Sequence, residues 1–258
     1  MRSGPRLALL AAAGLVILPL AAAVIGALPG FGERIAPYGA RVNAIVPDER
    51  HVANMVSAIN FDLRGLDTLG EEFMLLAAIT GTVVLLRGRR GEGTSERALQ
   101  LPGRAVLPRS DAVVLACRVA GPLIALFGLY VVLHATVTPG GGFQGGVILA
   151  TATLLIYLGE GYSGWREAVR SHWLDAMEGG GALLFVLCGL SPMTFGAAFM
   201  QNVLPLGAFR DVFSGGLMLV ENLGVALAVA GGFTQLFLEF MEETREADTT
   251  EEPGEDSA

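Results

Sequence analysis

Two carboxylates at the entrance to an apolar segment are the residues best placed for chemistry in this sequence. Asp67 and Glu71 lie just before the apolar segment 73–86. They are four residues apart, so a helix would present both on one face. Two like charges in a poorly solvated site disfavour double ionisation, so the pair can hold one proton between them. This pattern indicates a proton relay or a site for a monovalent cation.

The same residues also fit a structural role. Thr68 followed three positions later by Glu71 has the spacing of a capping box at a helix N-terminus. We favour the ion role, with Glu71 ahead of Asp67 and Glu72, because an ionisable side chain is costly at membrane depth and marks a functional site by default.

Two further ionisable residues lie at or inside apolar segments. Glu221 is about six residues into the last such segment, roughly 9 Å below its start, and Asn222 follows it. It is either a functional acid or a side chain that snorkels or hydrogen-bonds between helices. His134 ends another apolar segment, where a structural hydrogen bond and a proton-transfer role both remain open.

A glycine-rich run, residues 134–146, joins two apolar segments. It reads His-Ala-Thr-Val-Thr-Pro-Gly-Gly-Gly-Phe-Gln-Gly-Gly and contains no Asp, Glu or Arg. Pro139 predicts a break in the helix, and the three glycines after it allow a tight re-entry. Gly145 and Gly146 predict a close seam between helices. The run also matches the G-x-G-x-x-G pattern, but dinucleotide binding requires a preceding strand, so we do not expect it here.

The elements that carry these residues are predicted to cross a membrane. Of the 258 residues, 52% are hydrophobic and only 16% are charged, whereas soluble domains have about 25% charged residues. A helix needs about 20 apolar residues to span the hydrocarbon core. We therefore expect an all-α integral membrane protein with about six transmembrane helices. The candidate segments are 7–28, 73–86, 112–133, 143–158, 182–200 and 215–238.

The candidate segments differ in length. The second and fourth are short, and they reach membrane length only if they extend into 66–70 and 140–142. The first is longer than the apolar region of a signal peptide, so we expect a retained helix. Cys117 and Cys188 lie in apolar stretches far from any metal-ligand spacing, so neither a disulfide nor a metal site is expected.

Charge is distributed unevenly along the chain. The stretch 239–258 holds nine acids and one Arg, which accounts for the net charge of −8 of the whole chain. The remainder is balanced, so it offers no basic surface for nucleic acid. The Arg-rich stretch 87–111 predicts a cytoplasmic linker. This places both termini in the cytoplasm and residues 29–67 outside.

These features divide the chain into four predicted parts. Residues 1–86 form a two-helix module, and 87–111 form the linker. Residues 112–241 form a four-helix module. The acidic tail 242–258 cannot bury a core, so we expect it to be disordered.

The glycine-rich run resembles a known family signature, that of the B subunit of Mrp/Mnh multisubunit cation/proton antiporters. Residues from about 110 to 245 are similar to this four-helix MnhB module in length and layout. The family typically has Gly where this chain has Leu133, and an acid where it has Asn222, which here follows Glu221. The matching positions of the run are His134, Pro139, Gly140, Gly141, Gly142, Phe143, Gly145 and Gly146.

The run 62–71 resembles a second motif, Asp-aromatic-Arg-x-aromatic-Asp-Thr-Leu-Gly-Glu. That motif is found in the C-terminal part of the large A subunit of the same antiporters and in the E subunit of membrane-bound hydrogenases. Asp62, Arg64, Asp67 and Glu71 match it, and leucines replace both aromatic residues.

The two resemblances together imply a small accessory subunit of a large membrane complex. They imply Na⁺ or K⁺ exchange for H⁺ driven by the proton-motive force in the cell membrane, with other antiporter subunits as partners and no bound cofactor. The ion route would include Asp62, Asp67 and Glu71. The alternative is a structural membrane subunit of a hydrogenase-like or complex-I-like redox complex. We do not expect an enzyme, because no nucleophile–base pair supports one.

Overall fold

The computed structural model describes residues 3–28, 37–90 and 110–247. The chain divides into two compact units, Met1–Arg41 and Val42–Ala258. The first contains α1 (Ser3–Gly26), whose stretch Ala11–Gly26 is apolar. Pro19 lies inside this helix, as membrane helices tolerate. The predicted first apolar helix is therefore present, somewhat shifted toward the N-terminus.

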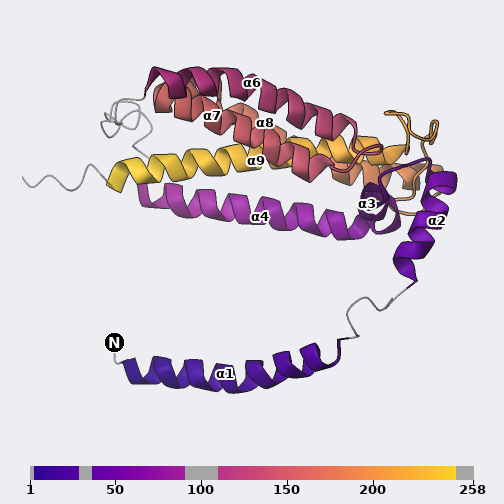
Figure 1. Ribbon diagram of the computed structural model, residues 1–258, viewed down its shortest axis with the longest axis horizontal. Helices are drawn as coiled ribbons and strands as arrows, with labels where there is room; N and C mark the ends of the chain where they lie inside the picture. Colours follow the sequence, from indigo (N-terminus) through magenta and orange to yellow (C-terminus); the bar gives the residue numbers. More distant parts are fainter. Residues whose placement is uncertain (1–2, 29–36, 91–109, 248–258) are drawn as a thin grey trace, which may run out of the picture. The chain divides into compact units, whose positions relative to one another are not determined.

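The second unit is a bundle of long helices (Figure 1). Five of its helices are long and apolar enough to cross a membrane. The described residues contain no strand, so the predicted all-α membrane fold is confirmed. The bundle helices are α4 (Gly65–Arg90), α6 (Asp111–Leu133), α7 (Gly142–Ala168), α8 (Ser171–Leu190) and α9 (Leu217–Ala247).

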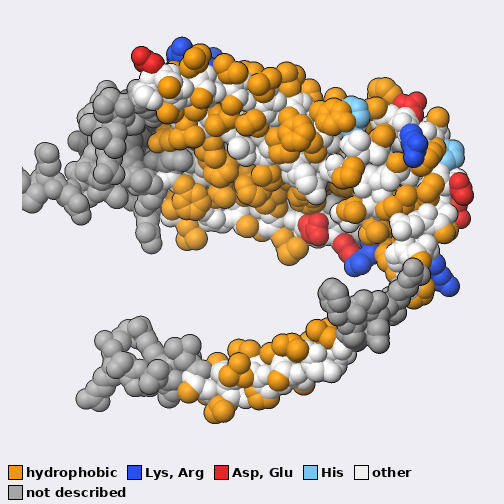
Figure 2. Space-filling view, viewed as in Figure 1, with side chains coloured by type: hydrophobic (Ala, Val, Ile, Leu, Met, Phe, Trp, Pro, Cys, Tyr) orange, Lys and Arg blue, Asp and Glu red, His pale blue; other side chains and the backbone are white. Residues whose placement is uncertain are grey.

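Helix α9 is the centre of the bundle. In an 18-residue apolar stretch of its span Leu217–Phe240, 72% of the residues are buried, whereas the share in the corresponding stretch of α6 is 11%. Helices α4, α7 and α8 pack against α9, and α6 packs mainly on α7. The outer surface is largely hydrophobic in the view of Figure 2, and charged side chains lie mostly toward the ends of the bundle. A helix surrounded in this way can keep polar side chains at membrane depth away from lipid.

Several predicted boundaries differ from the structure. The short segments 73–86 and 143–158 do extend, to spans of Gly65–Leu86 and Gly142–Gly161. The span predicted at 182–200 is present but lies further toward the N-terminus, since it begins at His172 and ends at Phe195. The helix continues through the glycines at 179–181, and Gly181 packs tightly against α9.

Residues 161–178, between the predicted segments 143–158 and 182–200, are also mostly helical. Helix α7 continues to Ala168 past a kink at Gly161, which has φ 83°. At the C-terminus, α9 runs to Ala247, so residues 242–247 are helical rather than disordered. Most of the predicted linker (91–109) and the end of the acidic tail (248–258) lie outside the described residues.

One end of the bundle is capped by short, irregular segments (Figure 1). Helices α4, α7 and α9 start at this end, and α6 and α8 finish there. We call it the capped end. Its segments are α2 (Tyr38–Arg50), α3 (Met55–Ala58), the π-helix η1 (Ile59–Leu63), the turn 134–141, the 3-10 helix η2 (Ser191–Phe195) and the loop 196–216.

Candidate functional site

Asn54 ties the glycine-rich turn to the start of α3. Its side-chain amide donates hydrogen bonds to three backbone carbonyls of the turn, at 2.8 to 3.0 Å. Its side-chain oxygen caps α3 by accepting from the backbone N–H groups of Val56 and Ser57. Asn54 is 7% exposed, so these bonds are shielded from water. The three acceptors in the turn are Ala135, Thr138 and Gly140.

Asn222 makes a second tie between the same segments from inside the bundle. Its Oδ1 accepts a hydrogen bond from the backbone N–H of Gly142 at 2.9 Å. Its Nδ2 donates to Ser57 Oγ at 3.1 Å and to the Met218 carbonyl at 2.8 Å. Asn222 is fully buried, and it therefore links the starts of α3, α7 and α9 at a point that water does not reach.

The glycines of the run allow α7 to approach its neighbours closely. A Cβ at Gly142 would overlap the carbonyl oxygen of Asn222 on α9. A Cβ at Gly146 would lie 2.7 Å from Val229 Cβ, and one at Gly145 would lie 2.9 Å from the carbonyl oxygen of Gly128 on α6. Contacts this short leave no room for any side chain. In the turn itself, Gly140 has φ 132°, which favours glycine.

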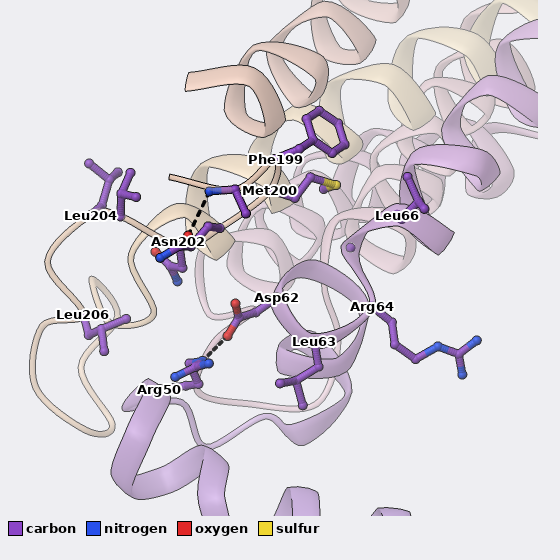
Figure 3. Close-up of a pocket in the computed structure, with 14 residues that line it drawn as sticks. Arg50, Asp62, Leu63, Arg64, Leu66, Phe199, Met200, Asn202, Leu204 and Leu206 are labelled. Carbon is purple, nitrogen blue, oxygen red and sulfur yellow. Dashed lines mark hydrogen bonds and ion pairs between the residues drawn. The ribbon is translucent and has the colours of Figure 1, made fainter. Parts of the chain in front are cut away.

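A pocket of about 680 Å³ opens at the capped end, between the η1–α4 junction and the loop after η2 (Figure 3). Asp62, on the π-helix η1, points toward Arg50 and forms an ion pair with it. The Asp62 side chain is only 8% exposed and that of Arg50 is 32% exposed. The pocket thus holds a shielded carboxylate with one cationic partner. Its other labelled walls are Leu63, Arg64, Leu66, Phe199, Met200, Asn202, Leu204 and Leu206.

Asp67 and Glu71, the carboxylates that the sequence favoured for an ion role, lie on the exposed surface of α4. Asp67 is exposed and pairs with Arg64, three residues earlier. Glu71 is also exposed, whereas its neighbour Glu72 is 3% exposed. The buried face of α4 instead consists of Gly65, Thr68, Glu72, Ile79 and Val83. The ion role of Asp67 and Glu71 remains a prediction, and their outward position would suit contact with another subunit.

His134 and Glu221 occupy different environments. His134 ends α6, where its ring stacks on Tyr130 with a centroid separation of 4.0 Å. Glu221 is 1% exposed, near the start of α9. The π-helix η1, which bears Asp62, packs against α9, so Asp62 and Glu221 lie at the same end of the bundle.

Sequence reasoning missed three residues of this region. Asn54 and Ser57 carry the ties described above, and the only local signal was an Asn at the start of a short helix. Glu178 lies outside the predicted apolar segments, yet it is on the buried face of α8 with Leu174, Gly181, Phe185 and Cys188. The helical spacing of that face is present in the sequence, but the predicted segment began only at residue 182.

The fold and this arrangement define a class of protein: an all-helical, multi-pass membrane subunit whose helices meet around a glycine-rich turn. Residues 112–235 match the model of a domain related to the MnhB subunit of Na⁺/H⁺ antiporters. The B subunit of a Na⁺/H⁺ antiporter of Bacillus subtilis is 32% identical over 120 residues, which cover 45% of this chain and 82% of that protein. The chain therefore belongs to the MnhB family of multisubunit cation/proton antiporter subunits.

Two solved structures resemble nearly the whole chain. One is a chain of the membrane-bound sulfane sulfur reductase, an archaeal respiratory membrane complex, with a TM-score of 0.71 and 28% identity; the match covers 93% of this chain and 99% of that one. The other is a chain of the Mrp complex from a Dietzia species, with a TM-score of 0.70 and 25% identity, covering 98% of this chain and 27% of that one. Both relatives are parts of multisubunit membrane complexes.

Proposed function

We propose that this chain is an accessory subunit of a complex that exchanges Na⁺ or K⁺ for H⁺ across the cell membrane, driven by the proton-motive force. The observation that carries the proposal is the joining of two motifs at the capped end. Asn54 and Asn222 connect the segment that bears Asp62 to the glycine-rich turn. A shielded carboxylate thereby lies at a fixed position beside a pocket.

The subunit would contribute mainly by holding acidic side chains in position. Asp67 and Glu71 are exposed on α4, so they would contribute to an ion route shared with a neighbouring subunit. The arginines of the linker favour a cytoplasmic position for both termini, and the capped end with its pocket would then lie on the outer side.

A transport assay tests this proposal. The assembled complex is produced in a host that lacks its own antiporters, and Na⁺- or K⁺-dependent proton movement is followed in everted vesicles. Glu71→Gln keeps the size and hydrogen bonding of the side chain but removes its charge. Transport should fall steeply while the subunit still accumulates in the membrane, and Glu71→Asp should retain part of it. Full transport in Glu71→Gln would remove this residue from the ion route.

A second candidate function is supported by the coverage of the structural matches. The sulfane sulfur reductase chain is matched over 99% of its length, so a chain of this size also occurs in a respiratory complex. A structural role in a redox complex of that kind is the alternative. Purification of the native complex distinguishes the two, because iron–sulfur subunits would co-purify only in the redox case.

A further inference from the structure

Three buried glutamates that the proposed function leaves unused lie along the interface of α4, α8 and α9. They are Glu72, Glu178 and Glu221, with exposed fractions of 3%, 7% and 1%. Both carboxylate oxygens of Glu72, one of Glu178 and one of Glu221 have no hydrogen-bond partner among the described residues. A buried ionised carboxylate without a partner is strongly disfavoured, so each of these groups calls for a proton or another ligand.

The three glutamates face a common line on α9. Glu221, Gly232 and Glu239 lie on one face of this helix, since 18 residues complete five turns. A Cβ on Gly232 would touch Ile79 of α4 and would lie 3.4 Å from the Glu178 carboxylate of α8. This contact places the Glu178 side chain of α8 beside Gly232 of α9. Glu239, also 1% exposed, ends the line.

Glu72 belongs to the same line. It shares the buried face of α4 with Ile79, seven residues further along, and α4 runs in the same direction as α9 (Figure 1). Glu72 therefore lies about 10 Å from the level of Gly232, on the side of Glu221. The order from the capped end is Glu221, Glu72, Glu178 and Glu239, which we call the glutamate file.

The length of the glutamate file matches the thickness of a membrane. Glu221 and Glu239 are 18 residues apart on α9, or about 27 Å, and the hydrocarbon core of a bilayer is about 30 Å thick. At the capped end, η1 packs against α9, and Asp62 of η1 lines the open pocket. The glutamate file thus begins at the end of the bundle that carries the pocket and runs through the membrane-embedded interior of the chain.

We propose that the glutamate file is a proton route through this subunit. The carboxyls of Glu221, Glu72 and Glu178 are neutral at rest. Glu178 passes its O–H proton through water to the Glu239 carboxylate, which releases it to water at the far end of the bundle. Glu72 and then Glu221 pass on their protons in turn, and a hydronium ion from the pocket reprotonates Glu221 by way of water. One O–H bond breaks and one forms at each step, no electron moves, and every group returns to its starting state. This inference rests on the proposed function only in that cation/proton exchange supplies the driving force.

The spacing favours protons over metal cations. A dehydrated Na⁺ or K⁺ ion needs several oxygen ligands around one point, whereas these carboxyls are spread along a line. The titratable groups beside them are also acids or thiols: Asp62 and Cys188 near Glu221, Glu71 near Glu72, and Asp175 near Glu178. Among the described side chains, no Arg or His pairs with the three unpartnered glutamates.

Chemical labelling provides a test that does not depend on transport. Dicyclohexylcarbodiimide reacts with protonated carboxyl groups in apolar surroundings. In membranes that contain the assembled complex, peptides bearing Glu72, Glu178 and Glu221 should be labelled, as measured by mass spectrometry. Exposed Glu167 is the control and should stay unlabelled. Absence of label on all three glutamates would overturn the proposal. This outcome can be measured even in a complex that shows no antiport.

Transport by glutamine variants gives the second readout. Glu72→Gln, Glu178→Gln and Glu221→Gln should each lower proton movement at least about tenfold, while Glu167→Gln should leave it unchanged. The aspartate variants should recover part of the rate, because they keep a titratable group. Normal transport in the three glutamine variants would overturn the glutamate file and leave the proposed function standing. A wild-type complex without any cation-dependent proton movement would instead overturn the proposed function.

Discussion

The backbone N–H of Gly142 donates to the side chain of Asn222 at 2.9 Å, across the interface between α7 and α9. This bond satisfies one of the free N–H groups at the start of α7, where no side-chain cap from the preceding residue is present. It is possible only because Gly142 has no side chain, since a Cβ would overlap the Asn222 backbone. The glycine and the asparagine therefore depend on each other.

Removing the Asn222 side-chain amide should destabilise the subunit. Asn222→Leu is similar in size but leaves the Gly142 N–H and the Ser57 hydroxyl without their partner in a buried site. We expect a loss of about 2–4 kcal/mol in the free energy of unfolding. Thermal unfolding of the purified subunit in detergent measures it. Gln144→Leu is the control, because Gln144 is an exposed amide in the same motif. An unchanged melting temperature in Asn222→Leu would show that these bonds contribute nothing.

Three consecutive glycines in α8 should respond differently to the same change. A Cβ at Gly181 would overlap the carbonyl oxygen of Gly224 on α9, whereas one at Gly179 or Gly180 would meet nothing within 4 Å. Gly181→Ala should cost about 1–3 kcal/mol. Gly179→Ala and Gly180→Ala should be neutral or stabilise the helix by up to about 1 kcal/mol. Equal melting temperatures for all three variants would contradict the close packing of α8 on α9.

The Arg50–Asp62 ion pair at the pocket should contribute more to stability than the neighbouring Arg64–Asp67 pair. Asp62 is shielded, so Asp62→Asn removes a charge-assisted contact with Arg50 and should lower stability by about 1–3 kcal/mol. The Arg64–Asp67 pair is exposed on both sides, and Asp67→Asn should have little effect. Chemical denaturation of the two variants provides the comparison. A double-mutant cycle with Arg50→Met should show that most of the loss comes from the Arg50–Asp62 interaction.

The orientation of the capped end can be tested by cysteine labelling. In a variant with Cys117→Ala and Cys188→Ala, we introduce Phe213→Cys in the loop of the capped end, where Phe213 is 78% exposed. A membrane-impermeant maleimide added to intact cells should label this cysteine. A cysteine in the linker at Gln100 should react only after permeabilisation. The reverse pattern would invert the proposed topology.

Much of the fold follows from the sequence, because membrane spans are marked by long apolar segments and by the turn residues between them. Pro139 and the glycines after it marked the end of one helix and the start of the next. The span beginning at His172 was harder to place. Its glycines suggest a break when read alone, but Gly181 is there to let α9 approach, and that partner is more than 40 residues away in the chain.

The candidate site could be predicted from the sequence less completely than the fold could. Glu71 and Glu72 are adjacent and chemically identical, and only the packing of α4 on α9 buries one and exposes the other. The motif resemblance pointed to Glu71, and nothing local distinguished Glu72. Asn54 was missed for a related reason, since its hydrogen-bond partners are more than 80 residues later in the sequence.

This long separation has a consequence for how the protein is made. The ribosome completes Asn54 and Ser57 well before the turn at 134–141 and Asn222 exist, so α4 enters the membrane while the polar groups at its capped end still lack their partners. These groups remain without their partners until α9 has been synthesised. Biogenesis of the capped end is therefore a late step, completed only after nearly the whole chain has been synthesised.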